Sequence, residues 1–71
     1  MNEFKLQSKR GRIASFSRSK ATGVVVIGKS KIHFAVTSFR SGRIARYPKS
    51  GETVEALLSE DGRLVSVWAE E

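Results

Sequence analysis

The chain of 71 residues contains no cysteine, only one proline and no long apolar run. The absence of cysteine excludes disulfides and thiolate metal sites, and nothing therefore indicates an oxidising compartment. The longest aliphatic run covers residues 24–27, so we expect neither a transmembrane helix nor a secretory segment. A chain of this length predicts one domain with a small core, which buries about 60% of its unfolded surface. With neither a membrane nor a secretory segment expected, we predict a cytoplasmic location.

Acidic residues are nearly absent from the first fifty positions. There, Glu3 stands against twelve of the thirteen Lys and Arg residues, so this part of the chain carries a net charge of +11. Residues 51–71 hold six acids and Arg63, a net charge of −5. A one-sided basic field attracts polyanions such as nucleic acid or an anionic membrane. The competing interpretation is ordinary solvated charge, which would not by itself leave the last third acidic.

Groups that could carry catalysis are also scarce. The chain has one histidine, His33, no cysteine, and acids that are confined almost entirely to the last third. Neither a metal site nor a catalytic base finds partners in such a set. We therefore expect no enzyme activity, no metal, no cofactor and no small-molecule substrate. The flat imidazole of His33 is instead a candidate for stacking on a base.

Residues 20–37 contain the clearest pattern in the chain. The β-branched run at residues 24–27 favours an extended backbone, and Gly28-Lys29 separates it from a second strand-like run. Glycine at the first central position predicts a two-residue type II′ hairpin turn. The resulting register pairs Ile27 with Ser30, Val25 with Ile32, Val24 with His33, and Gly23 with Phe34, where glycine leaves room for the ring.

Alternation across this hairpin produces two different faces. The predicted core face consists of Ala21, Gly23, Val25, Ile27, Ile32, Phe34 and Val36. The opposite face is mixed and cationic and consists of Lys20, Thr22, Val24, Val26, Lys31, His33, Ala35 and Thr37. We expect this second face to meet a polyanion.

The other strands are expected on either side of the hairpin. Residues 13–16 predict a first strand, and the arm at residues 1–8 either extends it or stays loose. Residues 51–59 predict a fourth strand, and Asp61-Gly62 is typical of a type I′ turn that leads into the last one. This register sets Glu60 opposite Arg63, Leu58 opposite Val65, Ala56 opposite Val67 and Glu55 opposite Trp68, with Val54, Ala56, Leu58, Val65 and Val67 buried. Trp68 is expected to plug a barrel end or to pack on the N-terminal arm.

Residues 38–50 form the longest segment without periodicity. Arg40, Arg43 and Arg46 recur every three residues, which predicts a short helical turn that Pro48 would end. A loop of this length in so small a domain suggests a binding role.

Two hairpins and an N-terminal strand predict an all-β chain of five antiparallel strands. Short strands with exposed edges invite aggregation, so partial closure into a small barrel is expected. An SH3-like barrel is one alternative. The long third connection favours the oligonucleotide/oligosaccharide-binding (OB) barrel.

The segment at residues 10–25 resembles the opening motif of cold-shock domains, a family with the OB fold. That motif reads K-G-x-V-K-W-F-N-x-x-K-G-F-G-F-I. The identical positions are Gly11, Phe16, Lys20 and Gly23, and the conservative ones are Arg10, Ile13 and Val25. The family's second motif, V-F-V-H-F, falls on residues 32–36, although a second alignment places His33-Phe34 on its H-F pair.

The resemblance extends over residues 9–69, with an acidic end at residues 70–71. Residues 48–55 are similar to the family's entry into strand four, and residues 62–67 to its last strand. The Tyr47-Pro48 region is closest to cold-shock-like domains at the front of small predicted membrane proteins, which leaves open that the chain is a fragment of a longer one.

The resemblance implies binding of single-stranded RNA or DNA through bases stacked on outward aromatic residues. Here the stacking positions are occupied by Ser15, Thr22, Val24, His33 and Ala35. Because each stacked base contributes about 1–3 kcal/mol, binding is expected to be weak and largely independent of sequence. Phosphate neutralisation by Lys and Arg would supply the rest, as in an RNA chaperone. Phe16, Phe39 and Tyr47 are the remaining aromatic candidates, although Tyr47 could simply pack on Pro48.

The predicted nucleic-acid-binding set combines basic, polar and aromatic residues from the barrel face and the long loop. Its members are Lys9, Arg12, Phe16, Arg18, Lys20, Thr22, Lys31, His33, Phe39, Arg40 and Arg43. The rival hypothesis is a monomeric interaction module that keeps the OB fold and binds a protein or an anionic membrane instead.

Overall fold

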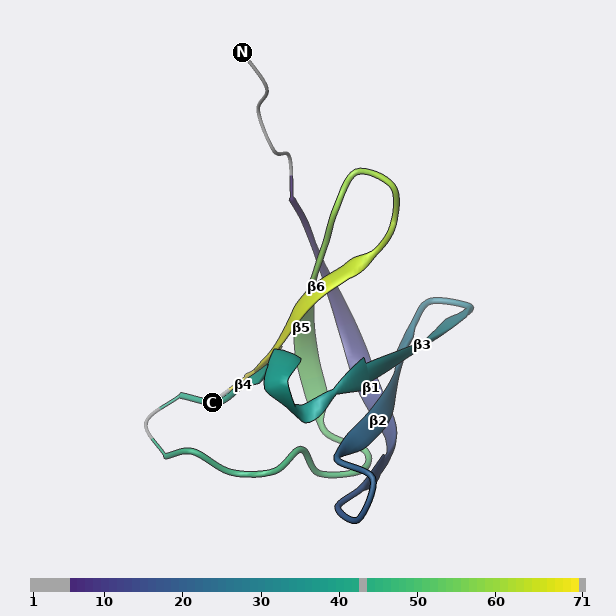
Figure 1. Cartoon of the computed structure of the whole chain (residues 1–71). Coiled ribbons are helices and arrows are strands. Elements are labelled where there is room, and N and C mark those ends of the chain that lie inside the picture. The colour runs from purple at the N-terminus through teal and green to yellow at the C-terminus, as the bar shows by residue number, and fades with distance from the viewer. Residues whose placement is uncertain (1–5, 43, 71) are drawn as a thin grey trace.

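The computed structural model describes residues 6–42 and 44–70, which form a single curled β-sheet (Figure 1). Its strands are β1 (Gln7–Ser17), β2 (Thr22–Ile27), β3 (Ser30–Ala35), β4 (Phe39–Arg40), β5 (Thr53–Leu58) and β6 (Leu64–Ala69). The one helical element in these residues is the 3-10 turn η1 (Val36–Ser38). The prediction of an all-β, barrel-like chain is therefore confirmed. No helix in this described part is long and apolar enough to cross a membrane.

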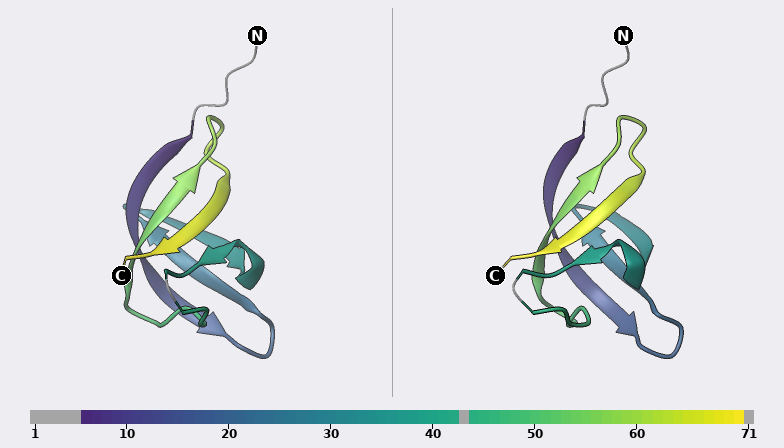
Figure 2. Two further views of the ribbon diagram at one scale, coloured as in Figure 1. Left: turned by 90° about the vertical axis from the view of Figure 1, so that its left-hand side faces the viewer. Right: turned by 60° about the vertical axis from the view of Figure 1, so that its left-hand side comes forward.

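The order of strands across the sheet is β3-β2-β1-β5-β6-β4. Four of the five pairings are antiparallel, whereas β4 runs parallel to β6, with Phe39 beside Val67 and Arg40 beside Trp68. The expectation of five wholly antiparallel strands is thus wrong at this edge. The chain leaves β3, turns through η1 and joins the opposite edge of the sheet as β4, which curls the sheet into a half-barrel (Figure 2).

Strand β1 is the longest element and holds the two halves of the sheet together. It begins at Gln7, well before the four residues that the sequence predicts for it. Its N-terminal part pairs with β5 over residues 7–12, and its C-terminal part pairs with β2 over residues 12–17. The β1–β2 register shifts between Ile13 and Ser15, so Ala14 forms a bulge. A bulge bends a strand and increases its twist, which lets β1 pass from one half to the other.

Gly11 permits a close approach at this crossing. A Cβ atom on Gly11 would lie 2.8 Å from the Val26 carbonyl oxygen and 3.0 Å from the Ile27 side chain. Any larger residue would therefore push β1 away from β2.

The β2–β3 hairpin has the predicted register at every pair. Gly28 has a φ of +62°, and Lys29 has no positive φ, as a type II′ turn requires. A Cβ atom on Gly23 would lie 2.8 Å from both the Phe34 ring and the Ser15 carbonyl oxygen, so this glycine does make room for the ring.

The second hairpin differs from its prediction. Ala56 lies opposite Val67 and Glu55 opposite Trp68, as expected, but Leu58 lies opposite Leu64 after a register shift. Among the described residues, Asp61 has no positive φ, which excludes the type I′ turn. Instead, the Gly62 amide donates to the Ser59 carbonyl at 3.0 Å with Gly62 at φ +84°, a turn that ends in a bulge.

The core consists of apolar side chains from all parts of the sheet. Its fully buried members are Ile13, Val25, Val54, Ala56 and Val67, and Phe34, Phe39 and Leu58 are nearly so. Val65, expected in this core, is 46% exposed, because the bulge gives its place to Leu64.

Candidate functional site

The outer face of β1, β2 and β3 carries three rows of side chains that run across the strands. Paired residues in a sheet point to the same side, so the register defines each row. The first row is Arg12, Val26 and Lys31, the second is Ser15, Val24 and His33, and the third is Ser17, Thr22 and Ala35. We call these nine residues the outer face. Its only ionisable groups are Arg12, Lys31 and His33, and none of the nine is acidic.

Four of the residues expected in the site lie on the outer face, namely Arg12, Thr22, Lys31 and His33. All four are exposed. Arg18 and Lys20, also exposed, belong to the turn that joins β1 to β2 and stands beside the third row. In this turn, Ala21 has a φ of +56°, a left-handed conformation that L-residues other than Asn and Asp rarely adopt. The β1–β2–β3 half of the sheet thus brings together six of the eleven predicted residues.

Lys9 and Phe39, both predicted site residues, lie off the outer face. Lys9 pairs with the buried Ala56, and the regular β1–β5 register puts it on the opposite side of β1 from Arg12. Phe39 is only 7% exposed and belongs to the core, so it does not present a face to a base. The Arg46 guanidinium covers its ring, 5.7 Å from the centroid.

The loop arginines do not align on a helical turn. Arg40 lies in β4. Its Nη1 donates to the Thr37 carbonyl at 2.6 Å and to the carbonyl of the preceding residue, Phe39, at 3.2 Å. Arg43 lies outside the described residues. No helix is found in the described positions between Arg40 and Arg46.

Arg46 forms a half-buried ion pair with Glu52. Its Nη1 and Nη2 donate to the two carboxylate oxygens at 2.9 and 2.8 Å, and Nη1 also donates to the Tyr47 carbonyl at 3.0 Å. The Lys49 amide donates to the same carboxylate at 2.6 Å. The Arg46 hydrogen bonds, supported by the Lys49 amide, lower the pKa of Glu52 although burial opposes the shift. Arg46 therefore holds the loop in place and is not available as a phosphate ligand.

Phe16 and Tyr47 meet at the end of the barrel next to the β1–β2 turn. The Phe16 side chain points inward, since Phe16 pairs with the buried Gly23. Its ring centroid lies 6.4 Å from that of Phe34 and 5.6 Å from that of Tyr47. The guanidinium of Arg18 lies over the Tyr47 ring, 5.1 Å from its centroid. This aromatic contact joins the β1–β2 turn to the long loop. The residue pattern identified Phe16 and Tyr47 singly, but only the folded chain brings the three side chains together.

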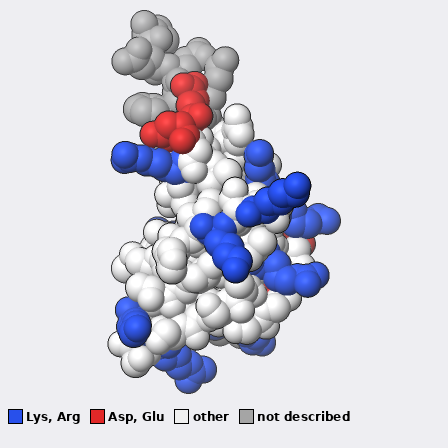
Figure 3. All heavy atoms as spheres, turned by 90° about the vertical axis from the view of Figure 1, so that its right-hand side faces the viewer, with Lys and Arg blue, Asp and Glu red and all other residues white. Residues whose placement is uncertain are grey.

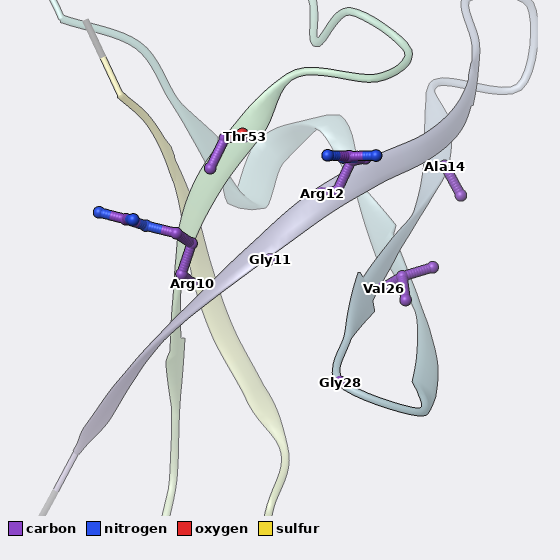
Figure 4. Close-up of a pocket in the computed structure, with 7 residues that line it drawn as sticks. All are labelled: Arg10, Gly11, Arg12, Ala14, Val26, Gly28 and Thr53. Atoms are coloured by element: carbon purple, nitrogen blue, oxygen red, sulfur yellow. The ribbon is translucent and has the colours of Figure 1, made fainter.

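A shallow hollow of about 440 Å³ opens where β1 leaves β2 (Figure 4). It is lined by Arg10, Gly11, Arg12, Ala14, Val26, Gly28 and Thr53. The hollow continues the first row of the outer face, since Thr53 pairs with Arg12. Arg10 and Thr53 were not predicted as site residues. The basic cluster at residues 9–12 was the available signal, but its contact with β5 depends on the length of β1.

Trp68 lies on the outer side of the other half of the sheet. It is 45% exposed, lies opposite Glu55 and donates from Nε1 to the Ser66 hydroxyl at 2.9 Å. The expectation that it plugs a barrel end is therefore wrong. Contacts with residues 1–5 lie outside the described residues.

Basic side chains spread over the face that carries the β2–β3 hairpin, whereas most of the acidic ones in the same view gather at its upper end (Figure 3). In residues 6–42 and 44–70, no three His, Asp or Glu side chains converge as metal ligands would. No family model, no curated protein and no solved structure matches this chain.

Proposed function

We propose that this chain is an OB barrel of the cold-shock type and that its outer face binds single-stranded nucleic acid. Binding is weak, electrostatic and largely independent of sequence. Neither a catalytic step nor a cofactor is part of this proposal.

The strand pairing supports the choice of the OB barrel. If β3 and β4 are counted as one strand interrupted by η1, the sheet has five strands. The third of these strands then pairs with β2 at its start and with β6 at its end. β1 pairs with both β2 and β5, which gives the partly open five-stranded barrel expected of this fold.

The observation that carries the functional proposal is the charge of the outer face. Arg12, Lys31 and His33 occupy it without an acid, and Arg18 and Lys20 flank it from the turn. Neutralising phosphates with the Lys and Arg residues of this set releases counterions, which favours binding whatever the base sequence. Because serine, threonine, valine and alanine fill the rest of the face, it offers little to read individual bases.

The test is a titration of a short fluorescent single-stranded oligonucleotide at several salt concentrations. With about four phosphates neutralised, the slope of log K against log salt should be about −3. The double variant Arg12→Gln/Lys31→Gln should bring this slope closer to zero by about 1.4. A matched control is Lys9→Gln/Arg63→Gln, which removes the same charge from positions off the outer face and should leave the slope unchanged.

Two results would overturn the proposal. One is an absence of oligonucleotide binding even at low salt, and the other is an equal loss of slope in the two double variants. If vesicles with anionic headgroups bind where the oligonucleotide does not, the chain is an interaction module for membrane surfaces instead.

A further inference from the structure

Among residues 6–42 and 44–70, the ring of Tyr47 is the one aromatic surface near the outer face that is both exposed and held in position. It is 47% exposed, its ring lies 5.6 Å from the Phe16 ring, and the Arg18 guanidinium lies over it, 5.1 Å from its centroid. Trp68, similarly exposed, lies on β6 between Glu55 and Arg40 and does not belong to the outer face.

The backbone that carries Tyr47 is fixed on both sides. On one side, Arg46 is clamped by Glu52 and donates to the Tyr47 carbonyl at 3.0 Å. On the other, Pro48 is buried, and the end of the loop is joined to β1 by the Gly51 amide, which donates to the Ile13 carbonyl at 2.7 Å. A ring that is already positioned loses little conformational entropy when a flat ligand stacks on it.

We propose that Tyr47 binds a nucleobase on the ring face that Arg18 covers in the free protein, and that Arg18 then moves to a phosphate of the same strand. This inference rests on the proposed function, and it adds a single stacking site to a surface that otherwise binds phosphates. Guanidinium groups and bases both stack on aromatic rings, so one can replace the other at little cost. Arg18 is exposed and extends from a turn, which allows this exchange.

Affinity measurements distinguish the contribution of the Tyr47 ring to binding from the contribution of the Arg18 charge. Tyr47→Leu, which keeps an apolar side chain against Phe16, should weaken binding of a short single-stranded oligonucleotide about tenfold without changing the salt slope. Tyr47→Phe should bind as the original chain does. Arg18→Ala should bring the slope closer to zero by about 0.7, since one phosphate contact is lost.

An abasic oligonucleotide of the same length is the matched control ligand, because it keeps the phosphates and has no base to stack. The original chain and Tyr47→Leu should bind it equally. If Tyr47→Leu weakens binding of the abasic strand as much as of the normal one, the ring acts through the fold and the inference is wrong.

A direct readout comes from Tyr47→Trp in a Trp68→Phe background, which leaves a single tryptophan at the site. Stacking of a base should quench its fluorescence on addition of the normal oligonucleotide and not of the abasic one. If the original chain binds but this quenching and the tenfold loss are both absent, the stacking site is refuted while the phosphate-binding face stands. If the original chain does not bind at all, the proposed function itself fails.

Discussion

Each of the two hairpins of this sheet has a glycine in its turn, but the turn keeps the predicted register in only one of them. In the β2–β3 hairpin, the register runs unbroken from the turn to the end of the strands. In the β5–β6 hairpin, the register shifts between Leu57 and Leu58, close to the turn, and Val65 is left exposed. The first hairpin carries cations on its outer side, and the second carries Glu55 and Trp68 there.

Side chains at the turn explain the difference. Ser59 bonds to the Asp61 carboxylate through its hydroxyl, and the Arg63 amide donates to that hydroxyl at 3.2 Å. Such local side-chain bonds compete with the regular ladder and favour a longer, bulged turn. Gly28-Lys29 has no side chain of this kind, so its turn follows the backbone preference alone. A turn dipeptide therefore predicts register well only where neighbouring side chains do not bond to the turn.

The largest difference between the hairpins should appear on substitution of one glycine in each. Gly23→Ala should lower the free energy of unfolding by about 3 kcal/mol, because the new methyl group meets the Phe34 ring and the Ser15 carbonyl. Gly62 has open space around it, so Gly62→Ala should lower the free energy of unfolding by about 1 kcal/mol, through the positive φ of this position alone. Urea unfolding of both variants measures this, and equal losses would contradict the packing argument.

Acid should act differently on the carboxylate of the long loop and on that of the β5–β6 turn. The pKa of Glu52 lies below its usual 4.5, so its contribution to stability is present above pH 4.5 and is lost as pH falls through the lowered pKa. Glu52→Gln should lower the free energy of unfolding at pH 7 by about 2 kcal/mol and flatten its dependence on pH below 4.5.

Asp61→Asn is the matched variant for this experiment. The Ser59 hydroxyl lowers the pKa of Asp61 as well, but this carboxyl is fully exposed. At each pH between 7 and 3, the urea midpoint of Asp61→Asn should therefore differ little from that of the original chain. A larger change there than in Glu52→Gln would show that the bulged turn, and not the loop clamp, governs acid stability.

A substitution in the β1–β2 turn should increase the stability of the protein. Ala21 has a φ of +56°, and Ala21→Gly removes this strain at the cost of a more flexible unfolded chain. We expect a net gain of about 0.5–1 kcal/mol in thermal or urea unfolding. Ala35→Gly, in a regular strand, should instead lose a similar amount, and a gain in both would refute the strain argument.

The smallest effect is expected at the ion pair that ties β1 to the C-terminal end. Arg10 donates from Nε to Glu70 at 3.1 Å, and the arginine side chain is 74% exposed. Arg10→Gln should change the free energy of unfolding by less than about 0.5 kcal/mol, because water and salt screen such pairs. Arg46→Gln, which breaks the half-buried pair with Glu52, should cost several times more in the same urea assay.

Much of the cationic half could be predicted from local sequence. The β-branched run, Gly28 and the alternation of residues 20–37 led to the observed register, and with it to the placement of Lys31 and His33 beside each other on one side. Two of the failures depended on partners distant in the chain, and the third depended on side-chain bonds within the β5–β6 turn. Lys9, Phe39 and Val65 were misplaced because β1 continues into the other half, β4 pairs with β6, and a bulge resets the second hairpin.

By itself, then, the order of residues determined the all-β character, the tight bend at Gly28 and the separation of basic from acidic segments. These features follow from torsional preference, alternation and charge, which act between neighbours along the chain. Only the folded sheet decided that Arg46 clamps Glu52 and that Arg18, Phe16 and Tyr47 share one corner. The Arg18–Phe16–Tyr47 contacts join segments that are distant in the chain, and the Arg46–Glu52 pair depends on the path of an irregular loop, so no periodic pattern encodes either one.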